Sequence, residues 1–244
     1  MRHAAALLAL CAGAAAPAAA QRWVVTAADG CEALTVWWEA PAAAVASLAG
    51  KRWAPEPGDS PGTADLGWVV VQCASGAIDG RRVGPHALAA PLVRLAGGRA
   101  PGLPDAQVGI GPVIAEPGSP AHALLRAAGL AVVDGVVTFR PRPMGRGARV
   151  IATAGDADGR LVVEAEVEPG AAAVGDDAAI ASLGDGPVVA LTGPVAAVRA
   201  GEAAAVVLGE GNTLVARVGL PPRPARVTYD RRCTWDLSFA PSAR

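Results

Sequence analysis

The segment RVIATAGDADGRLVVEAEV, residues 149–167, decides the fold class of this chain. In its second half, Leu161, Val163, Ala165 and Val167 share one face under the two-residue period of a β-strand, and charged side chains occupy the other. An apolar run of the same kind precedes the turn-forming stretch 155–159. The pattern predicts an antiparallel hairpin with one face in a core and the other in water.

The same two-residue period recurs along most of the chain and predicts a mainly β protein. A hairpin is expected at Asp134-Gly135, and another between residues 203–208 and 213–218. Further strands are expected at 33–39, 66–74, 86–95, 107–115, 188–192 and 225–229.

Two short helices are expected, at residues 41–49 and 119–128. Proline stands in the first turn of each, and a glycine directly follows each. Ser119 can cap the second helix. Because there is no linker and no internal repeat, residues 21–244 are predicted to form one domain. Its fold class is mainly β and mostly antiparallel, either a β-barrel or a two-sheet cone, with these two helices.

Residues 1–20 are predicted to be a cleavable signal peptide. Arg2 is followed by an apolar run over 4–16 and by small residues up to Ala20, after which cleavage is expected. The run is shorter than the roughly 20 residues that a membrane span needs. Leu10 before Cys11 disfavours a lipid anchor. A secreted or periplasmic protein is therefore expected, and the sequence does not separate these two.

Charge and histidine content restrict the expected partners. Lys and Arg number 21 against 22 Asp and Glu, so the strongly basic balance of nucleic-acid binders is missing. Only His86 and His122 follow the leader, with no further histidine near either. We therefore expect no nucleic acid, no metal and no cofactor. His122 is expected to be exposed on its helix.

Three cysteines follow the leader: Cys31, Cys73 and Cys233. In an oxidising compartment two of them should pair. Residues around Cys233 alternate so that it shares a face with large apolar side chains, and a buried free cysteine packs as a small hydrophobe. This favours a Cys31–Cys73 disulfide.

Four residues are candidates for a site: Trp38, Glu39, His86 and Glu116. Trp37 and Trp38 should face opposite ways, one into the core and the other outside or against a helix. Trp38, beside Glu39, would line a pocket or pack in the core. His86 shares strand parity with apolar neighbours and would be a core or a pocket residue. Glu116 ends an apolar strand, as barrel-mouth residues do, or is a solvated loop carboxylate.

The order of elements from 33 to 167 resembles that of the acetoacetate decarboxylase family. In that family an early strand leads into a short helix and a proline-bearing loop. An apolar strand, two long strands, a second helical segment and a β-meander follow. The corresponding ranges here are 33–39, 41–49, 66–74, 86–95, 107–116, 119–129 and 136–167.

The resemblance implies a barrel-like or cone-like fold but carries no catalytic residue over. Such decarboxylases form a Schiff base through a lysine, and the corresponding segment 116–129 contains none. Arg126 cannot replace it, because guanidinium stays protonated. Lys51 is the single lysine of the chain and lies elsewhere. The family's arginine at the end of the early strand is also replaced, since Trp37-Trp38-Glu39 stands there.

Three hypotheses follow. The first is a secreted, non-catalytic protein of this fold that binds a small apolar ligand, with Trp38, His86 and Glu116 as candidate contacts. The second is a lysine-free enzyme with lyase-like or hydratase-like acid–base chemistry, which requires Glu116, His86 and Glu39 to converge. The third is a structural or interaction module of the cell envelope, with a filled interior and an exposed apolar patch.

Overall fold

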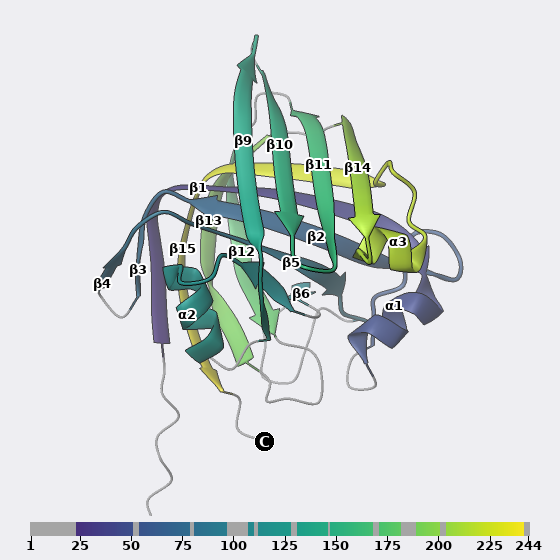
Figure 1. Ribbon diagram of the computed structural model, residues 1–244, viewed down its shortest axis with the longest axis horizontal. Coiled ribbons are helices and arrows are strands. Elements are labelled where there is room, and N and C mark those ends of the chain that lie inside the picture. Colours follow the sequence, from purple (N-terminus) through teal and green to yellow (C-terminus); the bar gives the residue numbers. More distant parts are fainter. Residues whose placement is uncertain are drawn as a thin grey trace, which may run out of the picture.

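The computed structural model describes residues 23–50, 54–78, 81–96, 107–109, 112–127, 131–145, 147–167, 171–181, 189–200 and 204–241. Within these ranges the chain forms fifteen strands and three short helices. The strands form two sheets of 11 and 4 strands, which confirms the mainly β, mostly antiparallel prediction (Figure 1).

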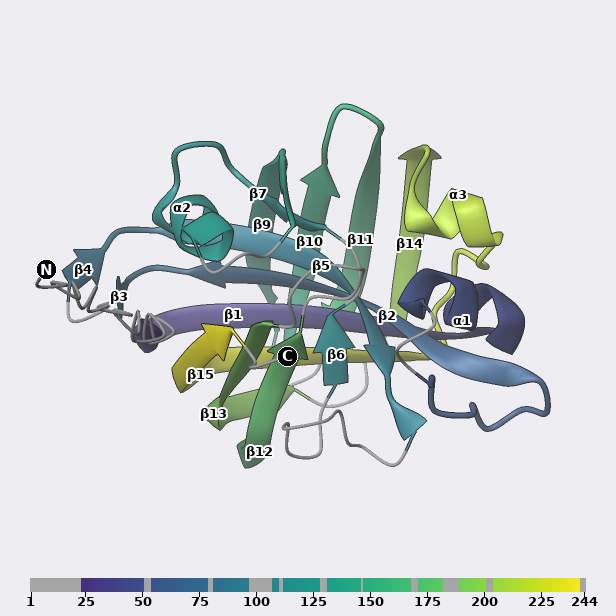
Figure 2. The same cartoon turned by 90° about the horizontal axis from the view of Figure 1, so that it is seen from below.

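The large sheet has the strand order β12-β13-β15-β1-β2-β5-β7-β8. All its described pairs are antiparallel except β7 with β8. The sheet curls until β12 comes alongside β6 (Figure 2). Its strands are β1 (Trp23–Pro41), β2 (Thr63–Cys73), β3 (Gly76–Ile78), β4 (Arg81–Val83), β5 (His86–Arg94), β6 (Gln107–Gly109), β7 (Val113–Ala115), β8 (Val132–Asp134), β12 (Ala171–Ala181), β13 (Val189–Ala200) and β15 (Arg226–Pro241).

The small sheet lies across one face of the large sheet. Its order is β14 (Ala204–Gly211), β11 (Gly159–Val167), β10 (Gly147–Gly155) and β9 (Val136–Met144). Its strands cross β1, β2 and β5 steeply (Figure 1). The predicted hairpin is confirmed, with Ala154 opposite Leu161 across its turn.

The main core fills the space between the two sheets. The apolar faces of β10 and β11 pack against side chains such as Leu66 of β2 and Trp38 of β1, both almost fully buried. The Trp38 indole Nε1 donates a hydrogen bond to the Pro221 carbonyl oxygen at 3.0 Å. The prediction that one of the paired indoles enters the core is therefore confirmed for Trp38.

Trp37 points to the opposite face of β1 and is also buried, at 3% exposure. Its ring lies over Gly67 of β2, where an added Cβ would come within 2.6 Å of the ring. The guanidinium carbons of Arg94 and Arg226 lie 5.2 and 5.7 Å from the ring centroid. Trp37 is thus neither exposed nor packed against a helix. Arg94 and Arg226 flank its ring on the face of the large sheet that points away from the core between the sheets.

The two predicted helices are present as α1 (Ala42–Ala49) and α2 (Pro120–Ala127). The expected strand over 213–218 is wrong, because residues Leu214–Val218 form a helix, α3. Thr213 caps its start by accepting from the Ala216 amide, and Gly219 closes it at φ 69°.

The predicted hairpin at Asp134-Gly135 is also wrong. Residues 132–134 form β8, which pairs with β7 in the large sheet, whereas β9 pairs with β10 in the small sheet. Gly135 is the point where the chain passes from one sheet to the other. A side chain there would meet the Gly155 carbonyl oxygen and Ile114, so glycine permits a close backbone approach rather than a tight turn.

None of the helices in the described ranges has the length and apolar character needed to cross a membrane.

Candidate functional site

A cavity of about 80 Å³ lies between the two sheets, beside the β10–β11 turn and α3. Its wall is mostly apolar, and its rim carries a few polar groups. The lining residues are Trp68, Pro91, Pro112, Ile114, Ala154, Asp156, Gly159, Leu161, Asn212, Thr213, Leu214 and Arg217. A space of this size accommodates a molecule of about five to eight non-hydrogen atoms, at about 10–15 Å³ for each water-sized atom.

Trp68 is the distinctive group in the cavity wall. It stands on β2 between Val36 of β1 and Pro91 of β5, and it is 7% exposed. Its indole Nε1 is the one buried side-chain nitrogen or oxygen without a hydrogen-bond partner in the described part of the chain. An unpaired buried donor costs about 1–3 kcal/mol. A bound molecule with an acceptor atom would satisfy it.

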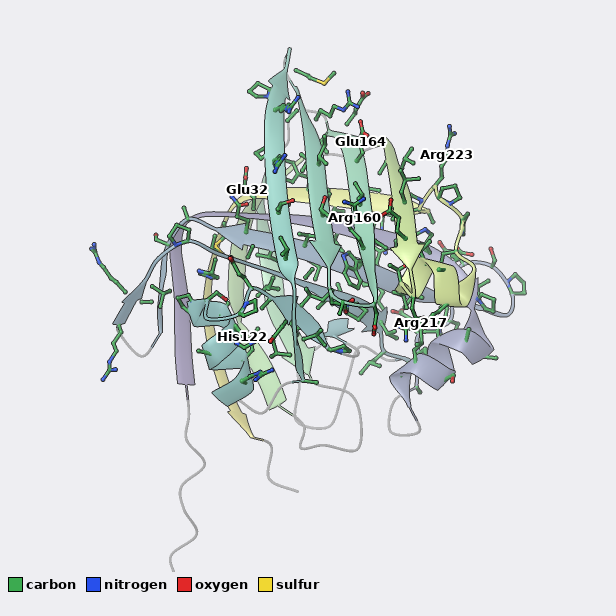
Figure 3. All side chains as sticks on the ribbon, in the orientation of Figure 1. Glu32, His122, Arg160, Glu164, Arg217 and Arg223 are labelled. Atoms are coloured by element: carbon green, nitrogen blue, oxygen red, sulfur yellow. A yellow bond between two sulfur atoms is a disulfide. The ribbon has the colours of Figure 1, made fainter. Side chains whose placement is uncertain are left out.

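The polar rim includes a carboxylate that is used in the turn and a cation that has no ion-pair partner among the described side chains. Asp156 Oδ1 accepts from the backbone amides of Asp158 at 2.9 Å and Gly159 at 3.1 Å, so it is used in the turn. Arg217 extends from α3 and is exposed (Figure 3). Among the described side chains none forms an ion pair with it. The site therefore combines an apolar wall, a buried N–H donor and a cation at the mouth.

The candidate residues from the sequence do not line this cavity. Trp38 is 1% exposed in the main core, and its indole is already paired with Pro221. Glu116 is exposed in the loop between β7 and α2, where its carbonyl oxygen accepts from the Ser119 amide at 3.0 Å.

His86 and Glu39 lie at opposite ends of the β1–β2–β5 ribbon. His86 is paired with Cys73, which in turn pairs with Cys31. Glu39 follows Cys31 by eight positions on β1, a separation of about 26 Å along a strand. The His86 Nδ1 is 3.0 Å from the Gly84 carbonyl oxygen. The convergence that acid–base chemistry at Glu116, His86 and Glu39 requires is not found, and we do not propose that chemistry.

Glu39 has a local structural role. Hydrogen bonds from the Ser60 hydroxyl first, and also from Thr63 and the backbone of Asp59 and Ser60, hold the pKa of its carboxyl below the ordinary 4.5, against a smaller opposing effect of burial. The Thr63 Oγ1 donates to Glu39 Oε2 at 3.3 Å. These contacts fasten the loop before β2 to the end of β1.

We expect acid to weaken this attachment. A carboxyl whose pKa is depressed by folding contributes stability above its unfolded pKa, and that contribution is lost as the pH falls through the folded value. The free energy of unfolding of the wild-type chain should therefore drop between about pH 5 and pH 2. Glu39→Gln should show a smaller drop in urea titrations over the same range. An identical pH profile for the two proteins would contradict the role given to Glu39.

His122 is buried, which corrects the expectation that it is exposed. It is 9% exposed, and its Nε2 is 2.7 Å from Asp134 Oδ1. Arg126 also reaches this carboxylate, at 3.4 Å. The polar face of α2 is thus held against β8, well apart from Arg217 (Figure 3).

Exposed large apolar side chains lie on the two edge strands of the small sheet. Val206 and Leu208 of β14 are 41% and 59% exposed, and Val136 and Met144 of β9 are 64% and 48% exposed. Two strands, β10 and β11, separate these edges. The described surface thus has two separate apolar edges, whereas the envelope-module hypothesis requires one contiguous patch.

The predicted disulfide is confirmed. Cys31 of β1 and Cys73 of β2 are opposite each other and bonded, and both side chains are fully buried.

Lys51, the single lysine of the chain, lies outside the described residues.

Several known structures are similar to this architecture. An acetoacetate decarboxylase-like enzyme from Sphingomonas wittichii RW1 is 12% identical, with a TM-score of 0.57 over 91% of this chain and 94% of that one. The enduracididine biosynthesis enzyme MppR, with HEPES buffer bound, is 14% identical, with a TM-score of 0.54 over 91% and 86%. An acetoacetate decarboxylase is 7% identical, with a TM-score of 0.55 over 89% and 88%. The sequence matches no protein-family model and no curated protein. The chain has an acetoacetate decarboxylase-like fold, as the order of its elements predicted.

Proposed function

We propose that this chain is an exported, non-catalytic protein that binds a small, mainly apolar molecule through one hydrogen-bond acceptor. The observation that carries the proposal is the unpartnered Trp68 indole in the wall of the cavity between the sheets. Export is supported by the charged, apolar and small-residue order of residues 1–20 and by a disulfide in the folded part.

The absence of catalysis is supported by the sequence of the segment 116–129, which has no lysine. Two residues of the cavity wall, Asp156 and Thr213, are of types that can act as nucleophiles. Their side-chain oxygens already accept backbone hydrogen bonds, in the β10–β11 turn and in the cap of α3. Residues 21–244 would form the mature, single-domain protein.

The test follows the indole N–H of Trp68 directly. In two-dimensional ¹H–¹⁵N spectra, its resonance is identified by its loss in Trp68→Phe. Titration with 2-butanone, butyramide and butyrate, which share a four-carbon skeleton, should shift this resonance at about millimolar concentration. The probe that shifts it most identifies the acceptor class, and Arg217→Ala should weaken butyrate alone.

Trp68→Phe should weaken binding of the preferred probe about 3–10-fold, because one hydrogen bond is worth about 0.5–1.5 kcal/mol. Calorimetry or thermal shift measures the change. Trp38→Phe is the matched control, since it removes an indole N–H outside the cavity and should leave the affinity unchanged. A Trp68 resonance that none of the probes moves would contradict the proposed function.

A further inference from the structure

Three cysteines occupy one row of the large sheet. Cys31 on β1 is directly opposite Cys73 of β2 on one side and directly opposite Cys233 of β15 on the other. Residues paired across antiparallel strands have Cα atoms about 4.5–5.5 Å apart, and a disulfide bridges Cα separations of about 4.4–6.8 Å. Cys31 therefore has two positions beside it from which a cysteine can form its bridge.

The backbone around this row is irregular on the β15 side. The pairing of β1 with β15 shifts register both between Ala27 and Cys31 and between Cys31 and Ala33. Register shifts interrupt the ladder of hydrogen bonds and let a strand bend locally. By contrast, the pairing of β1 with β2 runs without a shift from Cys31 to Pro41. The junction at Cys233 is thus the more adjustable of the two.

Burial decides which thiol can attack the existing bridge. Cys31 and Cys73 are both 0% exposed, so a thiol from solution has no direct access to either sulfur. A thiol built into the same row of the sheet needs no such access. Because β15 and β2 flank β1 on opposite sides, an attack on Cys31 from β15 would be in line with the bond to Cys73, as thiol–disulfide exchange requires.

We infer that Cys31 is the centre of an intramolecular disulfide-exchange site in which its bridge moves between Cys73 and Cys233. The Cys233 thiolate attacks the Cys31 sulfur, the Cys31–Cys233 bond forms and the Cys31–Cys73 bond breaks. Cys73 leaves as a thiolate and takes up the proton that Cys233 gave up. One disulfide is present before and after, so no oxidant or reductant is consumed. The cross-link moves from β1–β2 to β1–β15.

The first test removes the present partner. Oxidised Cys73→Ala protein is quenched with acid, unfolded, treated with N-ethylmaleimide and digested with pepsin. Mass spectrometry should find Cys31 linked to Cys233, with neither labelled. Cys31→Ala is the matched control: Cys73 and Cys233 are two strands apart, about 9–10 Å, which exceeds the disulfide limit of about 7 Å. Both should be labelled there. Labelling of both Cys31 and Cys233 in Cys73→Ala would overturn the inference.

The second test uses the wild-type chain and holds even where Cys73→Ala fails to fold. After incubation at mildly alkaline pH and the same acid quench, most molecules should carry label on Cys233. A minor fraction should carry it on Cys73, because the bridge has moved. Cys233→Ala should reduce the label on Cys73 several-fold, to background. A wild-type chain whose Cys73 label does not exceed that background would overturn the exchange, whatever bridge the first variant forms.

Discussion

Replacing Trp38 with alanine should destabilise the protein by about 3–5 kcal/mol, the range for deleting a large buried aromatic side chain. Trp38 is 1% exposed and is among the largest fully buried side chains of the core. Its indole also donates to the Pro221 carbonyl oxygen at 3.0 Å, which ties the segment after α3 to β1. Urea unfolding monitored by circular dichroism measures the loss.

Trp38→Phe separates the two contributions. Phenylalanine keeps most of the apolar contact but lacks the N–H donor, so the loss should be only about 1–2 kcal/mol. Equal losses for the alanine and phenylalanine variants would show that the ring itself contributes little to the core, contrary to its burial.

Gly135→Ala should cost about 1–3 kcal/mol, as overpacking of a close contact does. An added Cβ would meet the Gly155 carbonyl oxygen more closely than real Cβ atoms approach, and would lie 2.5 Å from the Ile114 Cγ2. Backbone oxygen cannot rotate away as a side chain can. The two sheets must therefore separate locally where the chain passes between them, and the fall in urea midpoint measures the cost.

Gly84→Ala is the matched control for this prediction. Gly84 is exposed, and an added Cβ there meets nothing within 4 Å. Its stability should stay within about 0.5 kcal/mol of wild type. A Gly135→Ala protein as stable as Gly84→Ala would contradict the close approach of β8–β9 to β10.

The sequence predicts strands well where two-residue alternation is uninterrupted, as in the hairpin of β10 and β11. It misplaces residues 213–218 because Thr213 and Gly219 make local helix-capping contacts that outweigh the β-propensity of valine. It misassigns Gly135 because a glycine between apolar runs is equally suited to a tight turn and to a passage between sheets. That choice depends on contacts with Gly155, 20 positions further along the chain.

The candidate site, too, could be predicted from the sequence only in part. Trp68 shares strand parity with Leu66 and Val70, so its burial could be predicted. Its unpaired indole could not, because the lack of an acceptor depends on β10, β11 and α3, which are distant in sequence. His122 was misjudged for a similar reason. Its partner Asp134 lies on a strand whose parallel pairing with β7 has no signature in the chain.

The pairing of β1 with β15 has a consequence for how the protein is made. These strands stand near the two ends of the chain and are neighbours in the middle of the large sheet. Contacts of such long sequence separation form slowly, because closing the intervening loop reduces chain entropy before any contact compensates. During synthesis this sheet cannot be completed until β15 has emerged and can pair with β1. The topology therefore makes completion of the large sheet a late step in folding.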